Sequence, residues 1–226
     1  MARTATKTEL SRDAILDRAL AVADAEGLDA VTIRRLAQDL GVTPMALYWH
    51  VRSKDELLDA MGDRLYADLS YDIGPDAPWD ERLGAVMRTL VDALRRHPAC
   101  LELAYRRILA CPEGLAITEY TLRLLREQGF TPRQTANLAM HALQSAVTLV
   151  SGEPGTGQGS PEEQAATLEQ KRAALTALPD DQYPYLREMA DDLLQCDDVD
   201  EYYDFNIGLF VAGARASLST GVTPAR

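Results

Sequence analysis

Bulky side chains cluster on one short predicted helix near the start of the chain. They follow Pro44 and are Met45, Tyr48, Trp49 and His50. A helix turns by about 100° per residue, so the consecutive Tyr48, Trp49 and His50 cannot all face a protein core. Exposed aromatic side chains on a small helix indicate a binding surface. A helix that reads DNA in the major groove is the natural candidate.

The preceding residues predict the helix and the tight turn that hold this surface in place. The first helix of the pair has one apolar face, formed by Ile33, Leu36, Ala37 and Leu40. Gly41 follows at the position where a left-handed backbone costs little. Thr43 supplies an N-cap oxygen, and Pro44 occupies the first helical position, where its missing N–H does no harm. With a further predicted helix over residues 11–26, this pair completes a three-helix DNA-binding unit.

Another helix is predicted to begin immediately after the DNA-facing one. Ser53 and Glu56 have the spacing of a capping box, and the apolar pattern continues to about Tyr71. Because so few residues separate these two helices, any displacement of the far end of this connecting helix would reach the DNA-facing surface.

The breaker sequence Ile73–Pro78 predicts a domain boundary. We therefore expect a DNA-binding domain with its connecting helix in residues 1–72, and a larger helical ligand-binding and dimerisation domain in residues 73–226. The expected helices of the second domain cover residues 79–97, 100–109, 113–128, 131–150, 162–178, 184–195 and 200–219. No segment alternates at period two, so the predicted fold class is all-α.

Charge is distributed unevenly along the chain. The net charge of −12 argues against a general nucleic-acid coat, but residues 1–54 hold 8 basic and 7 acidic residues, leaving the acidity in the remainder. Basic side chains flank the predicted DNA-facing helix, where phosphate contacts are needed; they are Arg34, Arg35, Arg52 and Lys54. Ordinary scatter of charge along a chain is the alternative explanation.

The predicted helix over 131–150 is unusual because residues 134–152 carry no charged side chain. It has two apolar stripes and one polar, uncharged stripe, formed by Asn137, His141, Gln144 and Thr148. This stripe could line a ligand cavity and supply a few orienting hydrogen bonds, or it could be satisfied internally or at a dimer seam. Weaker cavity candidates lie upstream at Tyr105, Arg107, Thr118 and Thr121. Arg107 could bind an anionic ligand, with a surface salt bridge as its alternative.

The last predicted helix resembles the helix over 131–150 in composition. Residues 206–214 are uncharged, and Gly208, Ala212 and Gly213 are small enough for close helix approach. Two such helices predict a subunit interface, most simply that of a symmetric homodimer. The polar stripe and the lack of flanking basic residues argue against a membrane span.

The sequence gives little support for an enzymatic activity. The histidines show no metal-ligand spacing with cysteine or carboxylate residues. The Gly-x-Gly-x-Gly run at residues 155–159 follows a helix and lacks the GK[ST] of a phosphate-binding loop. No GxSxG is present, so we expect no catalytic residue, metal or cofactor. The three cysteines form no CxxC and the start has no apolar leader, which predicts reduced thiols in a cytoplasmic protein.

Residues 36–60, LAQDLGVTPMALYWHVRSKDELLDA, closely resemble the reading unit of the TetR family of transcriptional regulators, especially its tetracycline repressor branch. The resemblance continues more loosely through most of the chain. It implies a homodimeric, all-α repressor that a small molecule releases from a palindromic double-stranded operator. The family's DNA-contacting positions fall on Thr32, Arg34, Thr43, Pro44, Met45, Ala46, Tyr48, Trp49, His50 and Lys54.

Alignment with the tetracycline repressor branch argues against tetracycline recognition by this chain. It would place Val86, Leu90, Thr121 and Gln144 in the ligand cavity, which makes the cavity more apolar. Positions that hold a magnesium–drug chelate in that branch carry Ser70, the segment 104–109 and Gln144 here, so no chelate is expected. The family's polar base-reading position falls on Pro44, which predicts a different operator. Two alternatives stay open: a constitutive DNA-binding regulator, and a helical small-molecule-binding protein or enzyme.

Overall fold

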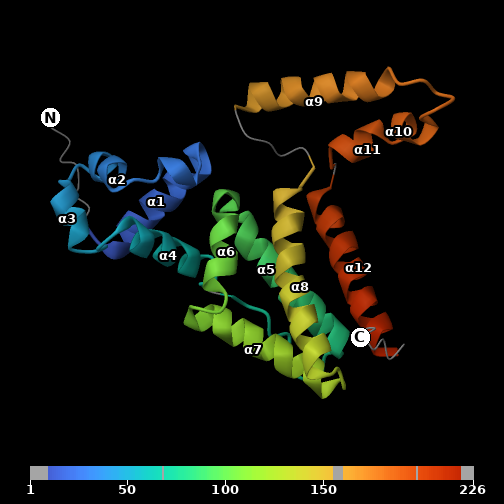
Figure 1. Cartoon of the computed structure of the whole chain (residues 1–226), viewed down its shortest axis with the longest axis horizontal. Helices are drawn as coiled ribbons and strands as arrows, with labels where there is room; N and C mark the ends of the chain where they lie inside the picture. The colour runs from blue at the N-terminus through green and yellow to red at the C-terminus, as the bar shows by residue number, and fades with distance from the viewer. Residues whose placement is uncertain (1–9, 68, 155–159, 197, 220–226) are drawn as a thin grey trace, which may run out of the picture.

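The computed structural model describes residues 10–67, 69–154, 160–196 and 198–219, and within these ranges it contains helices and no strand (Figure 1). This confirms the predicted all-α class. The first group of helices is α1 (Arg12–Glu26), α2 (Ile33–Asp39), α3 (Pro44–Tyr48) and α4 (Lys54–Arg64). The second group is α5 (Trp79–Arg95), α6 (Leu101–Arg107), α7 (Pro112–Glu127), α8 (Pro132–Ser151), α9 (Pro161–Thr176), α10 (Pro184–Glu188), α11 (Ala190–Leu194) and α12 (Val199–Ser219).

The helices α1, α2 and α3 form a small unit at one end of the molecule, with α4 leading from it to the rest (Figure 1). Each begins at a cap: the side chains of Ser11, Thr32, Thr43 and Ser53 accept backbone N–H groups. Of these caps, the sequence predicted Thr43 and Ser53. Leu36, Leu47 and Val51 are completely buried in the unit's core. Gly41 turns the chain between α2 and α3 with a positive φ of 66°, a conformation that costs glycine little.

The connecting helix α4 is shorter than predicted. It ends at Arg64 instead of continuing to Tyr71. The following N–H groups of Leu65, Tyr66 and Ala67 bond to carbonyls three residues back, which tightens and ends the helix. The buried Tyr66 hydroxyl donates to the Ala104 carbonyl at 2.8 Å. The tertiary contact with α6 therefore replaces the extra helical turn.

The larger body is built on α5, which packs against α8 on one side and α12 on another (Figure 1). Leu83, Met87, Val91 and Leu94 are among its fully buried residues. Two ion pairs, Arg88–Asp204 and Arg215–Asp80, link α5 to α12. These contacts fix the positions of the helices that surround the candidate cavity.

The helices α9, α10 and α11 pack mainly on one another and lie across the end of α8 and α12 (Figure 1). The prediction of a single helix over residues 184–195 was wrong. The chain leaves helical geometry at Met189 and forms the two short helices α10 and α11. The glycine run at 155–159 lies outside the described residues.

Candidate DNA-contacting surface and ligand cavity

The helix α3 has one buried and one exposed side. Leu47 is 0% exposed and anchors the helix, whereas Trp49 is 86% and Met45 68% exposed. Tyr48 is also exposed. Large apolar side chains held in solvent on a rigid helix are uncommon unless they contact a partner. The geometry supports the predicted DNA-facing surface.

The structure places most of the predicted DNA-contacting residues at the surface. Those exposed are Thr32, Arg34, Thr43, Pro44, Met45, Tyr48, Trp49 and Lys54, and those partly buried are Ala46 and His50. They come from the start of α2, from α3 and from the start of α4. The tight turn brings these three segments to one end of the molecule.

Arg35 differs from its neighbour Arg34. It donates to both Glu26 oxygens at 2.6 and 2.8 Å and to Asp39 at 3.0 Å. Arg18 also donates to Asp39, at 2.6 Å. Arg35 therefore joins α2 to the end of α1. The expectation that it serves as a phosphate contact is not supported by this arrangement.

These contacts predict an acid-sensitive DNA-binding unit. Hydrogen bonding to Arg35 lowers the pKa of Glu26, and hydrogen bonds from Arg18 and then Arg35 lower the pKa of Asp39. Carboxyl groups with a lowered pKa in the folded state stabilise it above their unfolded pKa, about 4. That stabilisation is lost as the pH falls through the folded pKa values. Arg35→Gln should therefore have a lower Tm than the wild type at pH 7, and the difference should shrink below about pH 4.

The control for this experiment is Arg34→Gln, which alters an exposed arginine on the same helix. Its Tm should follow that of the wild type across the pH range. A Tm difference for Arg35→Gln that stays constant from neutral to acid pH would show that the lowered carboxyl pKa values do not stabilise the unit.

An apolar cavity of about 200 Å³ lies between α5, the end of α6, α7 and α8. Of the predicted ligand-binding residues, Val86, Leu90 and Thr121 line it. Thr118 lines it too, as the sequence suggested. The wall otherwise consists of aliphatic side chains and Met140, and none of the described residues that line the cavity is charged. Such a chamber suits a small, largely apolar molecule.

Sequence reasoning missed much of the cavity wall. The lining residues not singled out as a site include Ile108, Leu109, Ile117, Leu122, Met140 and Leu143. An apolar stripe on the predicted helix over 131–150 already contained Met140 and Leu143. The missing information was which apolar stripe faces an unfilled space.

Two predicted ligand residues upstream lie away from this cavity. Arg107 donates to Asp63 at 2.6 Å and lies 3.4 Å from Asp59. The salt-bridge alternative for Arg107 is therefore the one seen. Tyr105 is exposed on α6 and does not line the cavity.

The polar stripe also lies outside the cavity. Asn137, His141, Gln144 and Thr148 are all exposed on α8. Three of them, His141, Gln144 and Thr148, line a shallow groove shared with α12, where the His141 and Phe210 ring centroids are 5.6 Å apart. The prediction that this stripe lines the ligand cavity is therefore wrong for the chamber between α5 and α8.

The helix α6 connects the cavity to the DNA-binding unit. Ile108 and Leu109, which line the cavity, directly follow α6. On its other side α6 packs against α4, where Gly62 allows close approach to Arg107 and Leu103. A movement of the end of α6 would be transmitted directly to α4.

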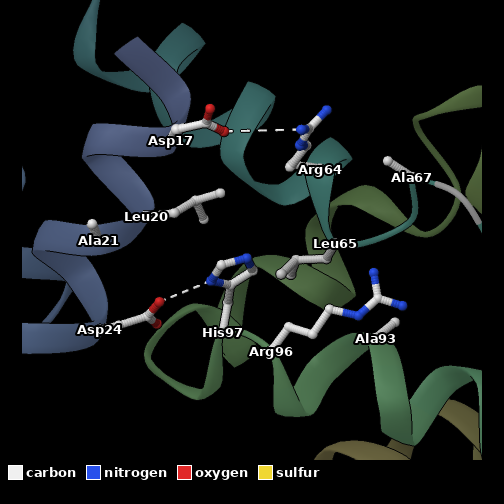
Figure 2. A pocket seen from close by; sticks show the side chains of 10 residues that line it. All are labelled: Asp17, Leu20, Ala21, Asp24, Arg64, Leu65, Ala67, Ala93, Arg96 and His97. Carbon is white, nitrogen blue, oxygen red and sulfur yellow. Dashed lines mark hydrogen bonds and ion pairs between the residues drawn. The ribbon is translucent and has the colours of Figure 1, made fainter. Parts of the chain in front are cut away.

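A second contact joins the two parts of the chain at the end of α5. His97 Nδ1 lies 2.8 Å from Asp24 Oδ2 on α1, and Figure 2 shows the ring turned toward this carboxylate. Around them is a space of about 370 Å³ between α1, α4 and α5. The charged Asp17, Arg64 and Arg96 also line it (Figure 2). The DNA-binding unit is thus held at two separate places.

None of the helices in the described residues is long and apolar enough to cross a membrane, and no cluster of metal-binding side chains occurs in the same ranges. Cys100 and Cys111 are buried free thiols, and burial raises the pKa of both. Such thiols are packing residues rather than nucleophiles.

Family models match both parts of the chain. Residues 15–61 match the model described as bacterial regulatory proteins, tetR family. Residues 74–218 match the tetracyclin repressor-like C-terminal domain. The first match contains α3 and its turn, and the second contains the apolar cavity.

Individual proteins are similar over different lengths. The repressor DrrR1 of Streptomyces coeruleorubidus is 34% identical over 148 residues, which are 65% of this chain and 52% of DrrR1. The chain thus spans about half the length of DrrR1. The class D tetracycline repressor of Escherichia coli is 28% identical over 93% of this chain and 91% of its own. The crystal structure of Streptomyces coelicolor ActR with (S)-DNPA superposes with a TM-score of 0.71 at 27% identity, covering 92% and 98% of the two chains.

Proposed function

Because the chain belongs to the TetR family of bacterial transcriptional regulators, we propose that it is a repressor released from its operator by a small, largely apolar molecule. The observation that carries this proposal is the position of α6. The two residues that directly follow it, Ile108 and Leu109, line an apolar cavity, while its body packs on α4, the helix that follows the DNA-facing α3. One short helix therefore contacts both the ligand space and the helix that leads to the DNA.

The proposed DNA complex is formed by a homodimer. The exposed stripe of α8 lies beside α12, which presents Phe205 and Leu209 to solvent. An uncharged surface with exposed large apolar side chains favours burial against a second copy. Two copies would place their α3 helices in successive major grooves of a palindromic operator.

The proposed release depends on different ligand affinities of two conformations. A ligand that favours a displaced α6 moves α4, so that the two α3 helices no longer match the spacing of the grooves. A nearly complete switch needs roughly 5 kcal/mol of differential binding. The related ActR structure was determined with the small molecule (S)-DNPA, which supports a ligand-binding role for this domain architecture.

Fluorescence anisotropy with the DNA upstream of the protein's own gene tests the proposal. We expect specific binding for which the logarithm of the association constant falls linearly with the logarithm of the salt concentration. It should also be reversed by an apolar compound that fills the cavity. Absence of sequence preference would rule out the regulatory role. Specific binding that no cavity ligand reverses would favour the constitutive alternative. The enzyme alternative is not retained, because the TetR family comprises transcriptional regulators.

A further inference from the structure

The two polar side chains in the cavity wall have hydrogen-bonding roles that constrain the ligand. The Thr121 hydroxyl donates to the Ile117 carbonyl at 2.8 Å. The Thr118 hydroxyl donates to the Gly114 carbonyl at 2.7 Å. The hydroxyl proton of each threonine is thereby engaged within α7, and each hydroxyl oxygen retains the capacity to accept a further hydrogen bond.

The rest of the wall offers a ligand no strong polar partner. Val86, Leu90, Ile117 and Leu143 are almost completely buried and aliphatic. A carboxylate or ammonium group placed among them would lose its hydration without gaining a partner charge. A neutral acceptor group would find a donor only if a threonine gave up its existing bond. A neutral donor group can bond to a threonine oxygen without breaking the existing bond of that hydroxyl.

We propose that the effector is an uncharged, largely apolar molecule that buries a hydrogen-bond donor, such as a phenolic hydroxyl, against Thr118 and Thr121. This inference rests on the proposed function and names the ligand class of its cavity. The size of the chamber sets the buried part of the ligand. An engineered apolar cavity of about 150 Å³ holds one benzene. The 200 Å³ here accommodates a compact ring system of one or two fused rings, with Met140 as a soft, adaptable part of the wall.

Three naphthalenes that differ in one substituent test the donor requirement. Equilibrium dialysis of the full chain at neutral pH would compare 2-naphthol, its methyl ether 2-methoxynaphthalene and 2-naphthoate. The naphthol should bind roughly five- to tenfold more tightly than the ether, as expected for one net hydrogen bond. The ether, which only accepts, should still bind, and the charged naphthoate should not.

Variants of the two threonines locate the acceptor. In Thr118→Val/Thr121→Val the preference for naphthol over the ether should disappear, while affinity for the ether stays within about twofold of the wild type. Thr121→Ser keeps the hydroxyl and should keep the preference. Thr167→Val is the matched control: Thr167 makes the same bond to the carbonyl four residues back, at 2.8 Å, but on α9. Circular dichroism would verify that each variant is folded.

The possible outcomes separate this inference from the proposed function. Equal binding of naphthol and ether, a preference that survives in the double valine variant, or tightest binding of naphthoate would overturn the donor requirement. In the first two cases the apolar effector cavity would remain. If none of the three compounds binds to folded protein, both the donor requirement and the effector cavity are wrong. Specific DNA binding, measured separately, would then remain as a constitutive function.

Discussion

Replacing Trp49 by alanine is expected to weaken specific DNA binding by roughly tenfold or more, while the folded protein keeps its stability. The side chain is 86% exposed, so its removal should change the free energy of unfolding by no more than about 0.5 kcal/mol. Loss of one specific contact at a protein–DNA interface costs about 1–3 kcal/mol. Anisotropy titrations with the upstream DNA, combined with urea unfolding, measure the two effects separately.

The buried neighbour Leu47 supplies the opposite case. It is 0% exposed, and Leu47→Ala should lower the free energy of unfolding by about 2–5 kcal/mol because it leaves a cavity in the core. If Trp49→Ala destabilised the protein as much as Leu47→Ala, or left specific DNA affinity unchanged, α3 would be a packing element and not the DNA-reading helix.

Replacing Gly62 by alanine is expected to separate α4 from α6. An added Cβ would lie 2.5 Å from Arg107 Cγ and 3.2 Å from Leu103 Cβ. Both distances are shorter than ordinary van der Waals contact, so either the Arg107 side chain, which is held by its bond to Asp63, or the helices must shift. Overpacking of this kind costs about 1–3 kcal/mol of unfolding free energy. Urea denaturation of the full chain measures this loss.

Gly84 in α5 provides the matched control for Gly62. A Cβ at Gly84 would meet only Val211 Cγ2 at 3.9 Å. Because alanine favours the helix over glycine by about 0.5–1 kcal/mol, Gly84→Ala should stabilise the protein. If the free energy of unfolding changed in the same direction in both variants, the α4–α6 contact would be looser than described. We also expect Gly62→Ala to weaken specific DNA binding, since the position of α3 depends on α4.

Local signals explain why the DNA-contacting part could be predicted from sequence. Caps at Thr43 and Ser53, and the turn glycine Gly41, act within a few residues of one another. Helical periodicity separated the buried Leu47 from its exposed neighbours. The end of α4 was not predictable in this way, because the apolar pattern runs on while the bond from Tyr66 to α6 ends the helix.

The candidate cavity illustrates a different limit. The uncharged stripe with His141 and Gln144 showed that one face of α8 is unusual, but helical periodicity does not tell a cavity from an outer surface. The alignment predicted four lining residues: Val86, Leu90 and Thr121 do line the chamber, whereas Gln144 lines the groove shared with α12. The contribution of Ile108 and Leu109 depends on where α6 ends relative to α8. That relation is set by packing between helices far apart in sequence.

The pair formed by His97 and Asp24 has a mechanical consequence. Under the proposed mechanism a ligand displaces α4 through its packing on α6. The contact between His97 and Asp24 joins α1 to the larger body at a separate place. One side of the DNA-binding unit would then move while the other side is held, so the unit would turn instead of shifting as a whole.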